Sequence, residues 1–275
     1  MEAWVFWVLQ HEIEIRLSCF FSIFALMAGW EILAPKRVLT AKKSVRWLNN
    51  LGLVFFNTIL LRFIFPLAAV SFAFYVEQLQ VGLLPYLGLP HSLDVVLAII
   101  LLDLGIYLQH VMFHALPLLW RLHRMHHADT DLDVTSGARF HPFEIMLSML
   151  IKFGLILLLG APAVAVLLFE VILNGMAMFN HSNIRLLQTI DCYLRWFVVT
   201  PDMHRVHHSS IVHETDSNFG FNLSWWDRLF GTYLSQPKLG HQHMQIGLTE
   251  FREAKFLTLP WLLVLPVLGK VSHKK

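Results

Sequence analysis

Clustered histidines are the residues of this chain whose type and spacing could carry chemistry. The sequence has sixteen histidines and two cysteines, so a metal bound here would have to be bound mainly by imidazole. Most of the histidines are three or four residues apart, which places imidazoles on one side of a helix. In chain order they are His110 and His114, then His123, His126 and His127, then His141, His181, and finally His204, His207 and His208.

The number of clustered histidines favours a dinuclear centre. Ten imidazoles are too many for one ion, because a catalytic zinc has typically about three protein ligands, but they suit two ions with four or five ligands each. A single H-x-x-x-H motif on a helix is common and usually has no function, and a single H-x-x-H-H motif does not by itself establish a metal site. Several such motifs at the edges of apolar runs, where ionisable groups are costly, point to a metal site. The remaining histidines are interpreted as surface or interface residues: His11, His91, His213, His241, His243 and His273.

Two polar residues precede the first histidine pair at helical spacing. Asp103, Tyr107, His110 and His114 step by four, three and four residues, so they form one stripe, and both Asp103 and Tyr107 are candidate catalytic residues. A metal-bound imidazole commonly donates its second N–H to a carboxylate, which makes Asp103 a candidate orienting partner. Asp103 could equally neutralise Arg62, a basic residue inside the preceding apolar run. The sequence leaves both roles open.

The composition predicts an integral membrane protein. Hydrophobic residues make up 56% of the chain and charged residues only 15%, and the mean hydropathy is positive. A water-soluble domain of this length could not bury so much apolar surface. The net charge of +2 is small and no nucleic-acid-binding motif is present, so nucleic acid is not an expected partner.

Apolar runs define the expected membrane segments. The runs 17–33, 48–76 and 95–114 are each long enough to cross about 30 Å of hydrocarbon as a helix. The region 145–178 is interrupted by Gly160-Ala161-Pro162, so it should form a hairpin that either crosses the bilayer or only enters it. We therefore expect an all-α integral membrane protein of four to five transmembrane or re-entrant helices. With no visible linker, residues 1–275 should form a single domain.

Basic residues predict the orientation of these helices. The loop between the second and third spans contains no basic residue. The loop after the first span contains five: Lys36, Arg37, Lys42, Lys43 and Arg46. By the positive-inside rule the first loop faces the cytoplasm. The alternation of spans then brings all ten clustered histidines to the cytoplasmic boundary, as a metal-binding cap. His11 and His91 fall on the opposite side.

These residues resemble the sterol desaturase and fatty acid hydroxylase superfamily of membrane-bound di-iron enzymes. The resemblance extends from Asp103 to Tyr233, and it places the catalytic region at 95–235. It rests on H-x-x-x-H at His110–His114, H-x-x-H-H at His123–His127 and again at His204–His208, Arg139–Glu144 around His141, Asn180-His181-Ser182, and the closing Trp226–Thr232 segment. The sequence around the last histidine box resembles the alkylglycerol monooxygenase branch more than the C-4 methylsterol oxidases. Relatives often have two histidines in the third cluster, where this chain has Ala177 and Arg185, and His141 would replace the missing ligand.

The resemblance implies two iron ions, O2 and a lipid substrate. The expected reaction is C–H hydroxylation, desaturation or ether-lipid oxidation. No dinucleotide-binding motif and no cytochrome-like region are visible, so electrons would come from an external ferredoxin, cytochrome or reduced pterin. Two other classes stay open: a histidine-lined metal transporter, whose ligands would lie near the bilayer midplane, and a b-type haem electron carrier. The sequence does not indicate the oligomeric state.

Overall fold

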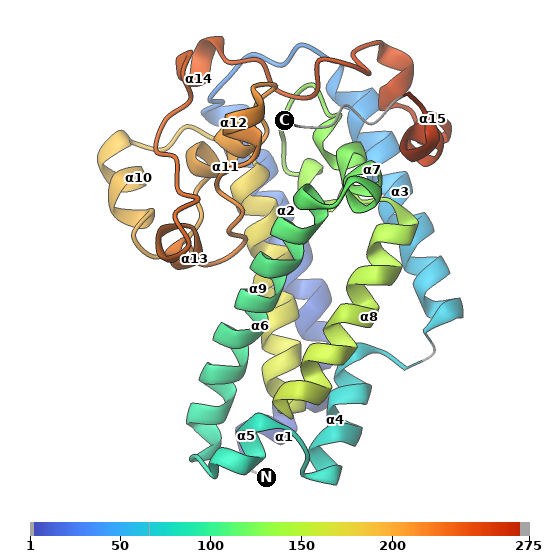
Figure 1. Cartoon of the computed structure of the whole chain (residues 1–275), viewed down its shortest axis with the longest axis vertical. Helices are drawn as coiled ribbons and strands as arrows, with labels where there is room; N and C mark the ends of the chain where they lie inside the picture. Colours follow the sequence, from blue (N-terminus) through green and yellow to red (C-terminus); the bar gives the residue numbers. More distant parts are fainter. Residues whose placement is uncertain (1–2, 66, 270–275) are drawn as a thin grey trace.

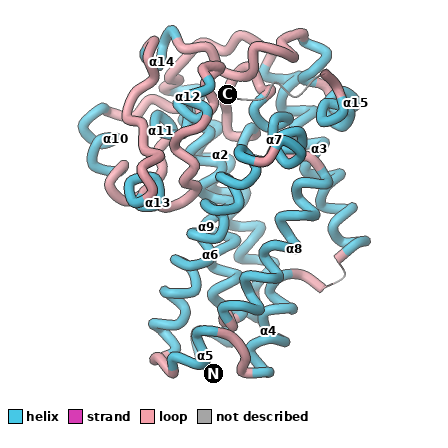
Figure 2. Tube along the Cα trace, viewed as in Figure 1, coloured by secondary structure: helices cyan, strands magenta, loops and turns pink. Residues whose placement is uncertain are grey.

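The computed structural model describes residues 3–65 and 67–269, in which helices are joined by loops that are longest at one end of the molecule (Figures 1 and 2). Within these ranges the β pairing is limited to isolated bridges, such as Val198 with Leu223. The expected all-α fold is therefore confirmed. The helices divide into an upright bundle and a cap of short helices and loops at one end of it (Figure 1).

The bundle contains the long helices. They are α2 (Glu12–Leu33), α3 (Lys43–Ile64), α4 (Ala69–Leu79), α6 (His91–Ala115), α8 (Pro142–Leu159) and α9 (Ala163–His181). Two short helices lie at the end far from the cap: α1 (Ala3–Gln10) and α5 (Leu83–Leu87). The cap contains α7 (Pro117–His127), η1 (Ser136–Ala138), α10 (Gln188–Leu194), α11 (Pro201–His207), α12 (Val212–Thr215), α13 (Trp225–Leu229), α14 (Gly240–His243), η2 (Ala254–Leu257), α15 (Leu259–Val264) and η3 (Leu265–Val267).

The bundle has the length and surface of a multi-pass membrane protein. Within the described residues, five segments are long and apolar enough to cross a bilayer: Glu12–Leu33, Lys43–Leu87, His91–Ala115, Pro142–Leu159 and Ala163–His181. Large apolar side chains are exposed on their outer faces, for example Leu33 at 86% and Phe63 at 84%. Such a surface is stable in a bilayer, where its apolar side chains contact lipid tails, but its exposure to water is costly.

The hairpin of α8 and α9 has two arms of membrane-spanning length. Gly160 ends α8 in the left-handed conformation, with φ of 64°, and Pro162 then precedes the first residue of α9. The turn is packed tightly, because a Cβ built on Gly160 would lie 2.3 Å from the carbonyl oxygen of Val81. Glycine therefore satisfies both the backbone conformation and the close approach.

The second expected span, 48–76, is divided into two helices. α3 ends at Ile64 and α4 begins at Ala69, with Pro66 of the sequence between them. Proline lacks the N–H that would continue a helix and disfavours helical backbone in the residue before it, which explains why one apolar run gives two elements. Together α3 and α4 lead from the cap to the far end of the bundle (Figure 1).

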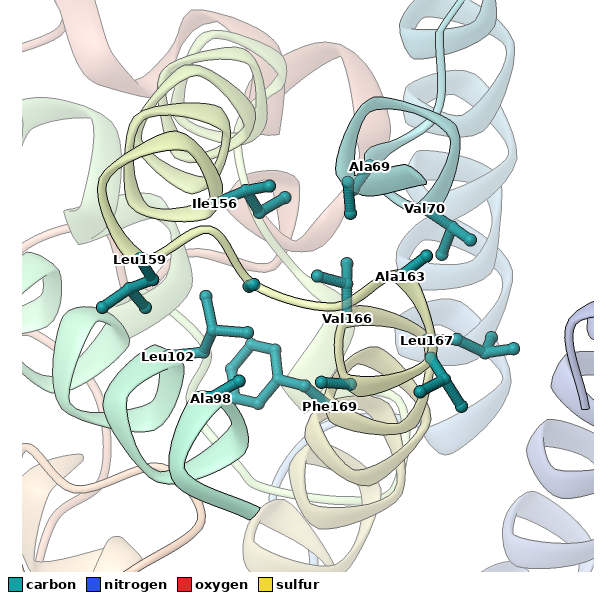
Figure 3. Packing of buried hydrophobic residues seen from close by; sticks show 14 of the residues in the cluster. Ala69, Val70, Ala98, Leu102, Ile156, Leu159, Ala163, Val166, Leu167 and Phe169 are labelled. Carbon is teal, nitrogen blue, oxygen red and sulfur yellow. The ribbon is translucent and has the colours of Figure 1, made fainter. Parts of the chain in front are cut away.

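Helix α9 lies at the centre of the bundle and packs against α2, α4 and α6. The core at the far end is apolar and closely packed: Ala98 and Leu102 of α6, Ile156 of α8, and Val166 and Phe169 of α9 meet there (Figure 3). Small residues such as Ala98 let the helix backbones approach closely. This packing fixes the cap-side ends of α6, α8 and α9 relative to one another.

Candidate metal centre

Nine of the predicted histidines converge in the cap as two buried groups. The first group contains His110, His114, His123, His127 and His207, and the second contains His126, His181, His204 and His208. Within each group the candidate ligand atoms lie within 4.8 Å of one another, and all nine side chains are buried. The sequence predicted four or five imidazoles for each of two ions, and the structure gathers five and four.

Helix geometry explains how the chain distributes these imidazoles. In α7, His123 and His127 are four residues apart and enter the first group, whereas His126 enters the second. In the last box, His204 and His208 share the second group and His207 belongs to the first. Residues four apart lie on one helix face and adjacent residues point about 100° apart. Each adjacent pair is therefore divided between the groups, which brings the two groups next to each other.

Hydrogen bonds at Nδ1 fix the tautomer of several rings. His110 donates to the carbonyl oxygen of Phe219 at 2.8 Å, and His207 donates to that of Ser217 at 2.8 Å. His181 donates to the carbonyl oxygen of Ala177 at 2.9 Å. Because a carbonyl oxygen only accepts, Nδ1 carries the proton in each neutral ring and Nε2 has a lone pair.

The Nε2 atoms of these rings lie unusually close together. His110 Nε2 is 3.1 Å from His123 Nε2, and the Nδ1 atom of His123 is 2.6 Å from the Glu144 carboxylate. In the second group, His181 Nε2 is 3.1 Å from His126 Nε2 and 3.0 Å from His204 Nε2. Neighbouring Nε2 atoms at such distances must share either a proton or a cation, so two groups of five and four buried imidazoles fit two metal ions. Contacts of Nδ1 with a carbonyl or carboxylate oxygen are also typical of metal-bound histidine, and they are present at His110, His123, His181 and His207.

Burial in the cap favours the neutral form of four of these imidazoles. Burial lowers the pKa of His126, His127, His204 and His208 well below the ordinary histidine value, and the neighbouring histidines lower the pKa further. Neutral imidazole is the form that binds metal. The set contains no thiolate, since Cys192 is exposed and Cys19 lies in the apolar part of α2. Nitrogen-rich sites of this type suit iron, copper or zinc.

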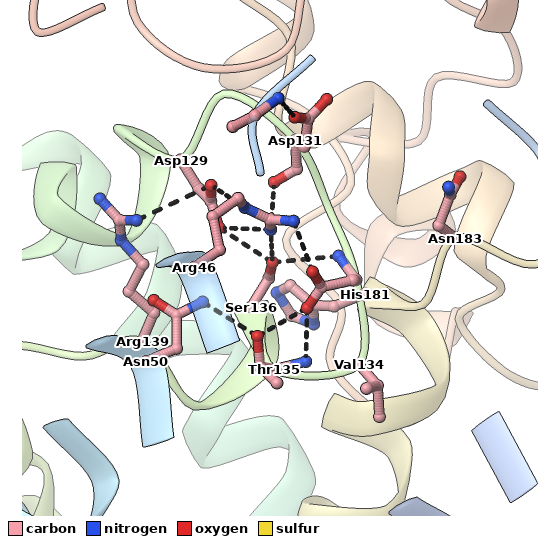
Figure 4. A network of polar contacts seen from close by, with 12 residues as sticks. Arg46, Asn50, Asp129, Asp131, Val134, Thr135, Ser136, Arg139, His181 and Asn183 are labelled. Atoms are coloured by element: carbon pink, nitrogen blue, oxygen red, sulfur yellow. Dashed lines mark hydrogen bonds and ion pairs between the residues drawn. The ribbon is translucent and has the colours of Figure 1, made fainter. Parts of the chain in front are cut away.

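A buried ion-pair network supports the loop that follows α7 (Figure 4). Arg46 of α3 is fully buried and donates to both carboxylate oxygens of Asp129 at 2.9 and 2.8 Å. The same guanidinium contacts Asp133 and donates to the hydroxyl of Ser136 at 2.9 Å. Burial would raise the pKa of Asp129, but Arg46 and Arg139 hold it at about 2. The network therefore fixes residues 129–136 beside the second histidine group.

Gly137 lets this loop approach α9. A Cβ at position 137 would lie 2.4 Å from the carbonyl oxygen of Ala177 and 3.0 Å from His181 Nδ1. The carbonyl of Ala177 is also the acceptor for His181. Any side chain at this position would therefore displace the backbone that orients a second-group histidine. Sequence reasoning missed both Gly137 and Arg46; the D-x-D-x-D spacing of Asp129, Asp131 and Asp133 was the available signal for the network.

The structure does not bring His141 into either group. Its Nδ1 accepts from the backbone N–H of Phe143 at 3.3 Å, as the N-cap of α8, and its Nε2 donates to the carbonyl oxygen of Leu263 at 3.1 Å. Both ring nitrogens are thus used by the backbone. A histidine before a proline at a helix start looks the same in sequence whether it caps the helix or binds a metal, which explains the difference from the prediction.

The two candidate catalytic residues of α6, Asp103 and Tyr107, contact the closing segment instead of the histidines. Asp103 accepts from the indole N–H of Trp226 at 2.9 Å and from the backbone N–H of Leu223 at 3.1 Å. Tyr107 shares a hydrogen bond of 2.9 Å with Thr232. Among the described residues, Asp103 therefore contacts neither a histidine nor Arg62, the two partners that the sequence left open. It anchors the chain at Leu223 and Trp226 instead.

Asp227 organises the same segment from within the cap. Its carboxylate accepts from the backbone N–H groups of Phe219 at 2.7 Å and Gly220 at 2.8 Å, and from the Thr232 hydroxyl at 2.7 Å. Burial raises the pKa of Asp227 to about 6. Because the carbonyl oxygen of Phe219 accepts from His110, these hydrogen bonds hold the acceptor that orients a first-group histidine.

An apolar cavity of about 320 Å³ leads from the first histidine group into the bundle. His110, His123 and Glu144 lie at one end of its wall, and residues of α3, α6, α8 and α9 line most of the remainder, together with Phe20 of α2 and Phe140. Apolar residues such as Ile106, Phe113 and Leu173 dominate the lining. A long hydrocarbon chain could therefore lie within the membrane-spanning region with one carbon beside the histidines.

The match to a family model decides the family. The model of the fatty acid hydroxylase family matches residues 95–232, which contain all nine histidines of the two groups. The chain belongs to this family. The resemblance inferred from the histidine boxes is therefore confirmed, together with a multi-pass membrane location.

Curated relatives share this region. An ornithine lipid hydroxylase of Rhizobium tropici is 31% identical over 150 residues, which cover 54% of this chain and 44% of that protein. Alkylglycerol monooxygenases of Xenopus tropicalis and Homo sapiens are 28% and 27% identical over 136 residues; these cover 50% and 48% of this chain, and 29% and 28% of the respective relatives. The chain thus spans less than half the length of these relatives. No solved structure gives a significant match.

Proposed function

We propose that this member of the fatty acid hydroxylase family is a membrane-bound, non-haem di-iron oxygenase that oxidises a lipid. One observation carries the proposal: two adjacent groups of buried imidazoles gather their ligand nitrogens at the end of an apolar cavity. Related proteins that hydroxylate ornithine lipids or oxidise alkylglycerols support a lipid as the substrate. The proposed catalytic region is 95–235 within a single domain of residues 1–275.

The proposed ligands are the nine histidines of the two groups, with one iron ion in each. Two iron ions held there would supply the oxidation of an unactivated C–H bond by O2. The protein orients four of the imidazoles through hydrogen bonds of Nδ1 with Phe219, Ser217, Ala177 and Glu144. It also holds them rigidly, because nearly all the atoms that orient the rings belong to buried backbone or to buried side chains.

The cavity would position the lipid and exclude water. His110 and His123 are the first-group histidines on its wall, so a carbon at this end would lie nearest the first group. Its apolar lining would bind an alkyl chain by burial of hydrocarbon surface and would keep bulk water from the reacting carbon. Asp103 and Tyr107 would act indirectly, by holding the segment that carries the acceptor of His110.

Electrons would come from an external donor, either a ferredoxin or cytochrome or a reduced pterin.

We also propose that the cap faces the cytoplasm. This orientation was predicted from basic residues, yet several of them have partners within the protein: Lys36 binds Asp202 at 2.5 Å, and Arg46 is buried against Asp129. Orientation therefore needs its own test. A cysteine introduced near His91 should react with an impermeant reagent from outside, and one near His213 should not.

Metal analysis combined with lipid analysis tests the function. Protein purified anaerobically should contain about two iron ions per chain, from the argument of four or five ligands per ion. Cells that express the gene should contain an oxidised lipid that is absent from cells without it. A single tightly held metal or a haem spectrum would contradict the dinuclear site. Iron at the expected level together with unchanged lipids and metal uptake by vesicles would instead indicate the transporter alternative.

A further inference from the structure

A charged cluster lies in the bundle at the end of the cavity opposite the histidines. Lys152 of α8 forms an ion pair with Glu170 of α9 at 2.5 Å, and Arg16 of α2 binds the other oxygen of the same carboxylate at 2.6 Å. All three are largely buried, with side-chain exposures of 14%, 12% and 28%. Charged groups within membrane-spanning helices are costly, so such a cluster is expected where it has a function.

Lys152 reaches the cavity that also contains the histidines. Glu144, Ser148 and Lys152 are four residues apart along α8 and all line this cavity. The ammonium group of Lys152 has three N–H donors, and one of them donates to Glu170. The lysine therefore has donor capacity for an oxygen atom of a molecule in the cavity.

A second cavity meets the first beside this cluster. It has a volume of about 190 Å³, lies between α2 and α9, and is lined by Arg16. Phe20, Asn174 and Met178 line both cavities. The two cations thus border neighbouring cavities on either side of the shared carboxylate, and Asn174 adds an amide at the junction.

We infer that Lys152, held by Glu170 together with Arg16, binds the oxygen of a lipid's carboxylate or carbonyl group, while the alkyl chain extends to the first histidine group. This assignment rests on the proposed function and specifies its substrate: a chain with an oxygen-bearing group at a fixed distance from the oxidised carbon. Lys152 is a substrate-binding and specificity-determining residue in this assignment. The ion pair with Glu170 holds the ammonium group of Lys152 where it can donate to the oxygen atom of the lipid.

The spacing along α8 sets that distance. Lys152 follows Glu144, which contacts His123, by eight positions on α8. A helix rises about 1.5 Å per residue, so the two positions are roughly 12 Å apart along the helix axis. With C–C bonds of about 1.5 Å and angles of about 111°, an extended chain advances roughly 1.25 Å per bond. The oxidised carbon should therefore lie roughly ten bonds from the oxygen-bearing group.

Ligand binding tests the inference independently of turnover. Dissociation constants would be measured with radiolabelled palmitic acid, methyl palmitate and hexadecane on the full-length protein purified in detergent. Lys152→Met should weaken binding of the acid or of both oxygenated ligands by about tenfold or more, as expected for loss of a charged hydrogen bond, and leave hexadecane unchanged. Loss of the acid alone would identify a carboxylate, and loss of both would identify a carbonyl.

Two further variants control for structural effects. Lys152→Arg keeps a cation at this position and should retain most of the affinity for the oxygenated ligands. Lys43→Met removes another lysine paired with a buried glutamate, Glu31 at 3.2 Å, but away from the cavity, and should bind all three ligands like the wild type. Lys152→Met should fold, because Arg16 still pairs with Glu170.

The outcomes separate this inference from the proposed function. Unchanged palmitate binding in Lys152→Met, or an equal loss of affinity for hexadecane, would overturn the inference. The role of the lysine would then be limited to its ion pair between α8 and α9. If the selective loss occurs but the iron-loaded enzyme oxidises no lipid, the lipid site stands and the proposed oxygenase function fails. In an active enzyme, Lys152→Met should also broaden the range of oxidised carbons, measured by mass spectrometry of the products.

Discussion

The far end of the bundle and the cap are both buried, but they bury different chemistry. In the bundle, residues such as Ala98, Ile156 and Phe169 are held by apolar contact, to which many neighbouring atoms contribute a little each. In the cap, guanidinium, carboxylate and imidazole groups each have specific partners, as Arg46 has in Asp129 and Asp133. Loss of one polar partner leaves a buried group unsatisfied, so the cap should tolerate substitution far less than the bundle.

The largest effect is expected for a histidine of the cap. His126→Ala removes one of the four imidazoles of the second group, so we expect loss of bound iron and of all detectable oxidation. Iron content and product formation would be measured on the same preparation. His243→Ala is the matched control, because His243 is exposed in the cap and belongs to neither group. A His126→Ala protein with both ions and full activity would contradict the assignment of the ligands.

The next effect is expected for the ion-pair network. Arg46→Met should lower the free energy of unfolding by about 3–5 kcal/mol, because the buried carboxylates of Asp129 and Asp133 lose their cation. Arg46→Lys should recover only part of the loss, because an ammonium group cannot bind both oxygens of Asp129 as a guanidinium does. Denaturation in detergent would give both values. An Arg46→Met protein as stable as the wild type would show that the cap does not depend on this network.

A smaller, pH-dependent effect is expected at Asp227. Because burial raises the pKa of this carboxyl to about 6, the folded state favours the protonated form. Its contribution is therefore fully present below about pH 4 and is lost as the pH rises through 6, a change of about 3 kcal/mol. Asp227→Asn should remove this component from the pH profile of the unfolding free energy. Identical profiles for the two proteins between pH 4 and 7 would refute the assignment.

The smallest effect is expected in the bundle. Ile156→Val removes one methylene group from the apolar core and should cost about 0.5–1.5 kcal/mol. Iron content and the distribution of products should match those of the wild type, because Ile156 contacts neither histidine group and lines neither cavity. A loss of iron in this variant would remove the distinction between the two regions.

Local features of the cap could be predicted from the sequence, whereas long-range ones could not. Spacings of three and four residues identified the histidines of α6, α7 and α11 because helix geometry alone places them on one face. Arg46 and Asp129 are 83 residues apart, so nothing local connects them, and Arg46 was interpreted only as a charge that sets orientation. The prediction for His141 differs for another reason: its local motif was visible, but that motif fits a helix cap as well as a metal ligand.

In the bundle, apolar runs predicted the spans but not their interruptions or their polar contacts. Pro66 was visible in the sequence, yet the run around it was interpreted as one span instead of two helices. Lys152, Glu170 and Arg16 come from three different helices, so their meeting depends on how the helices pack. Hydropathy along the chain contains no information of that kind.

The division of the histidines along the chain has a consequence for biosynthesis. Residues 110–127 provide four members of the first group and one of the second, and residues 181–208 provide the other four. The five candidate membrane-spanning segments of the described residues all precede residue 182, so the bundle can enter the bilayer before either group is complete. A nascent chain therefore has no finished site until His207 and His208 have left the ribosome. Iron should be inserted late, into a protein that is already in its membrane.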